Sequence, residues 1–296
     1  MEKQELTSAK SIAKWSGIIM IGFLFVLSNR VSALSTEFFI GVDERTNITS
    51  GVYAGLPNPN EGRLTFLFAH PNETDPSTSH YHSIGAYSYS GPADNPLINL
   101  TNTNNRIPET FSGQTALPLL PGSGVHAGHL VSQHVPGLEY SNLQMQSTQS
   151  LNGFGAGTVE DFLFHSSDDR WSGALDNVLV GLKLIGITNG LQVSDELGNT
   201  VLSSPNDVYT LGTGNSLSFT PTFFTLGDAP AGVYSASFGL VDLNGGALDS
   251  GIFHIDFQVS PVPEPTTVLM LLIGLIGIAA SRRRKFLVLS DRSFLN

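Results

Sequence analysis

Six of the eight histidines in this 296-residue chain lie between residues 70 and 134. Imidazole nitrogens bind Zn²⁺ and other transition-metal ions, so this grouping is the first chemical signal in the sequence. The first three, His70, His80 and His82, lie on either side of a short polar loop. If residues 64–70 and 80–90 pair as a hairpin, His70 ends one strand where His80 begins the next. His80 and His82 are two residues apart on a strand and therefore share a face.

We therefore expect three imidazole ligands, with a fourth position for water, a carboxylate or another histidine, an arrangement that suits Zn²⁺. Cu²⁺ and Ni²⁺ also accept imidazole nitrogen, so residue types alone do not fix the metal. Further ligands, expected with lower priority, are Glu73, Asp75, His126, His129 and His134. The alternative interpretation is that these histidines are solvated in polar loops and bind no metal.

Composition limits the kind of site and the kind of partner. Cysteine is absent, so metal ligands must be histidine and carboxylate, and the fold depends on its core rather than on disulfides. Residues 34–261 contain five Lys and Arg against 21 Asp and Glu, a net charge of −16. Such a surface repels phosphate backbones, and we therefore expect no nucleic-acid partner.

The N-terminus predicts a secretory signal peptide over residues 1–33. Lys3, Lys10 and Lys14 precede an apolar run over residues 15–27, and small residues occupy the cleavage positions at 31–33. The run is shorter than the roughly 20 residues that span a membrane. We therefore expect cleavage by signal peptidase rather than permanent anchoring.

The C-terminus carries three consecutive signals: a Pro-Glu-Pro sequence, an apolar run over residues 266–280 and a basic cluster. The residues of the Pro-Glu-Pro sequence and of the basic cluster are Pro263, Glu264, Pro265, Arg282, Arg283 and Arg284. Proline interrupts the preceding structure, and basic residues after an apolar helix mark its cytoplasmic end. A plain C-terminal membrane anchor is the simpler interpretation of these features.

The order of these signals resembles the PEP-CTERM sorting signal of bacteria that make exopolysaccharide. The resemblance implies recognition by an exosortase in the inner membrane and transient anchoring by the single hydrophobic helix. The protein would then reach the cell surface, the outer envelope or the extracellular matrix, where exopolysaccharide is an expected partner. Residues 286–296 continue beyond the basic cluster, which is a departure from the usual signal.

Between the termini the sequence predicts an all-β fold, because short apolar runs alternate with turns rich in Gly, Asn, Ser, Thr and Pro. No sustained helical period precedes the tail. The expected strands cover residues 37–42, 51–55, 64–70, 80–90, 130–133, 139–146, 159–165, 177–188, 191–194, 216–226, 232–242 and 252–259. The last two should form a hairpin.

We expect one or two antiparallel β-sandwich-like domains, with a joint at the glycine-rich residues 153–157. The predicted organisation is a signal peptide (1–33), a histidine-containing N-terminal β domain (34–152), a C-terminal β-sandwich domain (158–260), a sorting signal (262–285) and a tail (286–296). Residues 93–124 are loop-like, and a long irregular segment in a compact domain is usually functional or mobile.

A second resemblance concerns the folded part of the chain. Residues 51–60, 63–70, 80–89, 106–109 and 139–141 are similar to a family of cyanobacterial PEP-CTERM proteins described as repressed by the zinc-uptake regulator Zur. The resemblance covers roughly residues 38–150 and the sorting tail. It implies expression when zinc is scarce, and hence a role in zinc scavenging, storage or delivery.

Three hypotheses of function follow. The first is an exported zinc-binding protein of the cell envelope. The second is a structural or adhesive protein of the extracellular matrix in which the histidines have no metal role. The third is a zinc-dependent hydrolase with Glu73 or Glu109 as base. No catalytic motif is found in the sequence, so we do not expect an enzyme.

Overall fold

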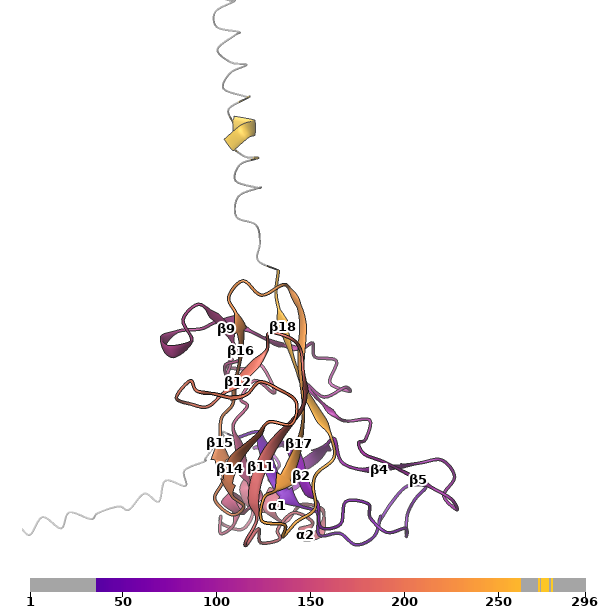
Figure 1. Ribbon diagram of the computed structural model, residues 1–296. Coiled ribbons are helices and arrows are strands. Elements are labelled where there is room, and N and C mark those ends of the chain that lie inside the picture. Colours follow the sequence, from indigo (N-terminus) through magenta and orange to yellow (C-terminus); the bar gives the residue numbers. More distant parts are fainter. Residues whose placement is uncertain (1–35, 262–270, 272, 277, 279–296) are drawn as a thin grey trace, which may run out of the picture. The chain divides into compact units, whose positions relative to one another are not determined.

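The computed structural model describes residues 36–261 and, near the C-terminus, residues 271, 273–276 and 278 (Figure 1). The predicted signal peptide, the tail and the sorting residues Pro263, Glu264, Pro265, Arg282, Arg283 and Arg284 lie outside the described residues. The described part consists mostly of β-strands, which confirms the predicted fold class. None of the helices described there is both long enough and apolar enough to cross a membrane.

The first sheet carries the histidine hairpin and has the strand order β15-β10-β1-β2-β3. β1 lies antiparallel to β2 and parallel to β10, so the sheet is mixed rather than purely antiparallel. Its strands are β1 (Phe38–Val42), β2 (Leu64–His70), β3 (His80–Ile84), β10 (Met145–Ser147) and β15 (Ser218–Phe219).

The second sheet has the order β14-β11-β17-β18-β6, with β7 also paired to β18. The predicted terminal hairpin is present as β17 and β18, whereas β6 and β7 run parallel to β18. The strands are β6 (Arg106–Ile107), β7 (Leu117–Pro118), β11 (Leu179–Ile187), β14 (Val208–Thr213), β17 (Gly232–Asp242) and β18 (Phe253–Val259).

Two further sheets complete the described fold. The larger has the order β13-β12-β16-β9-β8, and the smaller is the pair β4-β5. Their strands are β4 (Ser88–Ser90), β5 (Leu97–Asn99), β8 (Leu120–Pro121), β9 (His129–Val131), β12 (Gln192–Ser194), β13 (Thr200–Leu202) and β16 (Thr222–Leu226).

Strand β2 is buried on both faces. Phe66 and Phe68 belong to the main core, where the Phe66 ring stacks on that of Phe253 from β18 with centroids 4.2 Å apart. Leu67 and Ala69 alternate with them and belong to a second, smaller core. This two-sided burial explains the nearly continuous apolar sequence of the strand. Because side chains alternate along a strand, His70 lies on the same face as Phe66 and Phe68.

The helical segments are short, and one of them corrects the predicted secondary structure. Residues 159–165 were expected to form a strand, but Val159–Phe164 is helix α1. The Thr158 side chain accepts a hydrogen bond from the backbone N–H of Asp161 at 3.2 Å and thereby caps the helix. The other segments are α2 (Ser166–Asp169), η1 (Pro76–Thr78), η2 (Gly124–His126) and η3 (Thr148–Leu151). The predicted strand at residues 51–55 is a turn.

The predicted joint at residues 153–157 does not separate two sheets within the described residues. β10 pairs with β15, β6 and β7 pair with β18, and β9 pairs with β16, so strands from both sides of the joint share all three larger sheets. Glycine-rich sequence indicates local backbone freedom but does not determine which strands pair. A division into domains 34–152 and 158–260 is therefore not seen in this part of the chain.

Candidate metal centre

The β2–β3 hairpin brings three histidines to one face. In its register Phe68 lies opposite His82 and His70 lies opposite His80. Directly opposed residues point to the same side of a sheet, so the expected arrangement of the three imidazoles is present. Asn72 orders the connecting loop, because its side-chain oxygen accepts hydrogen bonds from two later backbone N–H groups.

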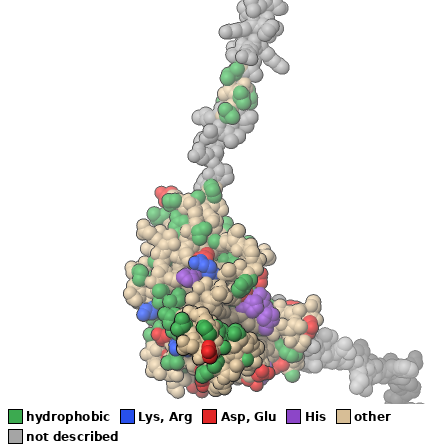
Figure 2. Space-filling model, turned by 90° about the vertical axis from the view of Figure 1, so that its right-hand side faces the viewer, with side chains coloured by type: hydrophobic (Ala, Val, Ile, Leu, Met, Phe, Trp, Pro, Cys, Tyr) green, Lys and Arg blue, Asp and Glu red, His purple; other side chains and the backbone are tan. Residues whose placement is uncertain are grey.

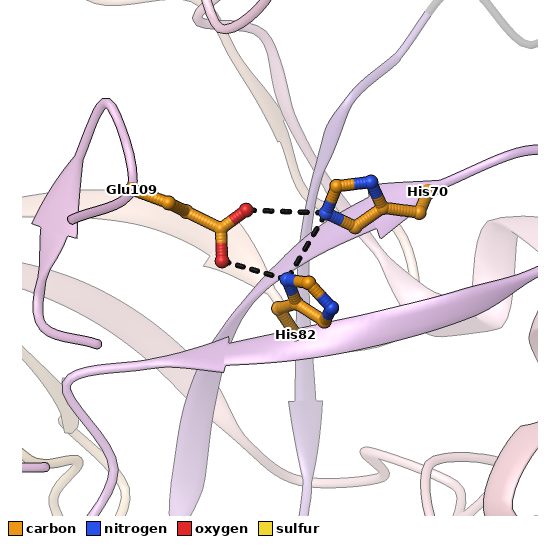
Figure 3. A group of neighbouring side chains, drawn as sticks. All are labelled: His70, His82 and Glu109. Carbon is orange, nitrogen blue, oxygen red and sulfur yellow. Dashed lines mark hydrogen bonds and ion pairs between the residues drawn. The ribbon is translucent and has the colours of Figure 1, made fainter. Parts of the chain in front are cut away.

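A carboxylate from the second sheet meets these histidines. Glu109 follows β6, which is held in place by its parallel pairing with β18. Figure 3 shows Glu109 directed at His70 and His82. The Glu109 Oε2 atom lies 3.1 Å from His70 Nε2, and Oε1 lies 2.7 Å from His82 Nδ1. The two ring nitrogens are 3.0 Å apart.

These separations are close to those of ligands around one metal ion. Two ligand atoms about 2.05 Å from a tetrahedral zinc ion lie about 3.3 Å apart. The contacts between the two ring nitrogens and the two Glu109 oxygens, 2.7–3.1 Å long, are a few tenths of an ångström shorter than this. Two imidazoles and one carboxylate form a known zinc donor set, which in catalytic sites leaves further positions open.

Glu109 is held as an anion at the base of the cluster, with 4 % of its side chain exposed. Asn104 Nδ2 donates to Oε1, and the buried Tyr140 hydroxyl donates to Oε2 at 3.1 Å. Burial alone would raise the pKa of Glu109, but hydrogen bonds from His70, Asn104 and His82 outweigh it and lower the pKa to about 2. The carboxylate is thus ionised at neutral pH and oriented by partners of its own, as metal-binding carboxylates usually are.

His80 does not contact Glu109 but contacts His82. The Thr78 carbonyl can only accept, so the His80 Nδ1 atom, 2.8 Å away, carries a proton and donates to it. The other ring nitrogen of His80 lies 3.3 Å from His82 Nε2. His80 thus lies against the side of the His82 ring that faces away from Glu109.

The remaining predicted ligands do not join this cluster. Among the described residues, the group of at least three His, Asp or Glu side chains whose ligand atoms all lie within 4.8 Å of one another consists of His70, His82 and Glu109. Glu73 and Asp75 are exposed in the hairpin loop. The second histidine set lies on other elements: His126 contacts Ser194, His129 packs on Phe224 and His134 contacts Ser141.

The sequence named Glu109 as a possible base but not as a ligand. It lies in the loop-like residues 93–124, 27 positions beyond His82, and reaches the cluster through the pairing of β6 with a strand near the end of the fold. The one sequence signal for Glu109 was its position directly after Ile107-Pro108 in an otherwise irregular segment. Ile107 is buried in the core and thereby anchors that segment.

A family model for the PEP-CTERM protein-sorting motif matches residues 261–285. The chain carries a PEP-CTERM sorting motif. This motif implies export, processing by an exosortase and a cell-surface or extracellular location. Searches of curated proteins and of solved structures found no match. The motif accounts for where the protein goes but not for the chemistry of its folded part.

Proposed function

We propose that this exported, exosortase-sorted protein binds a divalent transition-metal ion through His70, His82 and Glu109, with zinc as the expected metal. The observation that carries the proposal is the convergence of two imidazole nitrogens and a carboxylate within hydrogen-bonding distance of one another. The donor set matches zinc sites of the His₂Glu type. It also matches the two-histidine, one-carboxylate sites of non-haem Fe²⁺, so competition between metals is part of the test.

The expected role is zinc scavenging, storage or delivery at the cell envelope under zinc limitation. The His70 and His82 side chains are 28 % and 40 % exposed, whereas Glu109 lies at the base of the cluster. Metal ions in solution can therefore reach the two imidazoles directly. Figure 2 shows histidine side chains gathered in a patch on one face of the molecule. The net charge of −16 over residues 34–261 attracts cations toward this surface, and the similarity to Zur-repressed proteins supports the same role.

The proposed route of export has three steps. Signal peptidase removes residues 1–33, the C-terminal helix anchors the protein transiently in the membrane, and an exosortase then acts at the sorting motif. The protein would afterwards reside at the surface or in the matrix, in contact with exopolysaccharide. The sorting motif at residues 261–285 supports the exosortase step.

Metal binding is favoured over the two other hypotheses by the chemistry of Glu109. A structural or adhesive protein has no need of a buried carboxylate opposed to two imidazoles. A hydrolase needs a base whose pKa lies near the working pH, and the low pKa of Glu109 makes its carboxylate a weak base. Glu73, the other base considered, is exposed in the hairpin loop.

Calorimetric titration of the untagged, metal-free exported protein with Zn²⁺, Cu²⁺ and Fe²⁺ tests the proposal. We expect one zinc ion per chain, bound with a dissociation constant below about 10 μM. The His70→Ala, His82→Ala double variant should lose this binding. His165→Ala is the matched control, because that exposed histidine contacts Asp169 and lies outside the cluster. Zinc binding that survives the double variant would contradict the proposed ligands.

A further inference from the structure

A second site lies on the loops that precede β2 and on strand β4. A cavity of about 310 Å³ opens there, at the small end of the range of ligand pockets, about 300–1,000 Å³. It is lined by three segments of the chain, residues 45–60, residues 87–89 and Arg170. In Figure 1 the loops of the first segment run near β4 and β5. No residue of the metal centre lines it.

The charge of the cavity is opposite to that of the protein. Arg45 and Arg170 line it, although residues 34–261 contain only five basic residues. Among the described residues that form its lining there is no Asp or Glu. Each arginine is paired with one carboxylate outside the lining, Arg170 with Asp43 and Arg45 with Asp168. The lining itself therefore presents guanidinium groups without carboxylates, which favours an anion.

Both arginines are held in place by contacts that leave part of the guanidinium group for a ligand. Arg170 donates through Nε and Nη2 to the buried Asp43. Arg45 donates through Nη1 to Thr49 and through Nη2 to the Ser167 carbonyl. Its Nη2 atom also lies 3.6 Å from Asp168 Oδ2. Within the described residues, Arg170 Nη1 and Arg45 Nε have no partner. Ordered guanidinium groups lose little freedom when they bind a carboxylate.

Three tyrosines provide flat apolar surface beside these charges. The rings of Tyr53 and Tyr89 contact each other with centroids 5.4 Å apart, and their hydroxyls donate to the carbonyls of Gly91 and Pro57. Arg63 covers the Tyr87 ring, with its guanidinium carbon 4.0 Å from the centroid. Rings fixed in this way present aromatic faces at low entropic cost.

Buried asparagines join the segments into one unit. Asn58, 7 % exposed, donates to the Arg45 carbonyl at 2.7 Å. Asn60, 6 % exposed, both donates to and accepts from the backbone of Tyr87. These bonds connect the arginine-bearing loop to the tyrosine-bearing strand. The cavity is therefore a fixed feature of the fold and not an accidental gap between loops.

We propose that this cavity binds a carboxylated sugar unit, with Arg45 and Arg170 on the carboxylate and the tyrosines against the sugar ring. A pyranose ring combines apolar C–H faces, which pack on aromatic rings, with hydroxyls that bond to polar side chains, and a uronate adds the anion. The size of the cavity fits one or two such units. The proposal is independent of metal binding, because the two sites share no lining residue.

The test is NMR titration of the ¹⁵N-labelled, metal-free exported protein with D-glucuronate, D-glucose and acetate at equal ionic strength. We expect glucuronate to shift the amide signals of residues 53 and 87–89 and to bind at least tenfold more tightly than glucose or acetate. Arg45→Gln and Tyr53→Ala should each weaken glucuronate binding by at least tenfold. Arg106→Gln is the matched control, because Arg106 pairs with Asp256 outside the cavity.

Three outcomes would overturn the proposal. If acetate bound as tightly as glucuronate, the cavity would be an anion site without recognition of the sugar ring. If glucose bound as tightly as glucuronate, the arginines would have no role in recognition. Absence of any shift with all three probes would show that the cavity does not take this ligand class. Circular dichroism of each variant separates a lost site from a lost fold, and Tyr53→Ala, at a partly exposed surface tyrosine, provides a test that leaves the Arg170–Asp43 pair intact.

Discussion

Replacing Glu109 by Gln removes one negative charge with almost no change of shape and tests the electrostatics of the cluster. The pKa of Glu109 is about 2 in the folded protein against an ordinary value of 4.5. The ionised carboxylate therefore stabilises the fold at every pH above 4.5, and this contribution disappears as the pH falls from 4.5 toward 2. This difference in pKa corresponds to about 3 kcal/mol of folding stability.

The assay is urea denaturation of metal-free wild-type protein and Glu109→Gln between pH 2 and pH 8. We expect the variant to be less stable by about 3 kcal/mol at pH 7 and the two curves to converge near pH 2. Glu73→Gln is the matched control, since that carboxylate is exposed in the hairpin loop and should leave stability unchanged. Equal stability of wild type and Glu109→Gln at pH 7, or a difference that persists at pH 2, would refute the reasoning.

Three further predictions follow from other contacts. His80→Ala should weaken zinc binding by about 10- to 100-fold without removing a ligand, because His80 contacts the His82 ring and orients it; calorimetry at pH 7.5 measures this, and unchanged affinity would contradict the orienting role. Burial, followed by the charge of Glu139, raises the pKa of Glu37 to about 7, so ionisation of Glu37 costs stability as the pH rises from 4.5 through 7. Glu37→Gln should therefore raise the free energy of unfolding by about 2 kcal/mol at pH 8 and leave it unchanged at pH 4. The expected gain is smaller than the free energy equivalent to the full pKa difference, because the side chain is partly exposed to solvent. Thr158→Ala should lower stability by about 1 kcal/mol in urea denaturation through loss of the helix cap, and no change would assign the start of α1 to packing alone.

The histidine hairpin was accessible from the sequence because its determinants are local. The two strands are consecutive in the chain and separated by a short loop, and the side-chain period of two then fixes which histidines share a face. The apolar run over residues 64–70 similarly predicted the strand β2. Helix α1 was missed because its one capped turn is too short to display a helical period.

Strand partners within the described residues are chosen over long distances, so the sequence alone does not reveal whether the two predicted domains share sheets. The glycine-rich residues 153–157 predicted a joint, yet β10 and β15 lie side by side, with Met145 opposite Phe219. Local composition indicates where the backbone can bend. Only the burial of all strands together decides which edges pair, and here it brings both halves of the chain into the same sheets.

The sequence by itself determined the sorting motif, the all-β class and the common face of His70, His80 and His82, since each of these depends on residues near one another in the chain. Only the tertiary structure decided that Glu109, and not Glu73 or Asp75, meets two of the imidazoles. That choice depends on the parallel pairing of β6 with β18, whose partner residues Arg106 and His254 are far apart in the sequence. The same packing brings Asn104 and Tyr140 against the carboxylate, and a local pattern carries no information on contacts of this range.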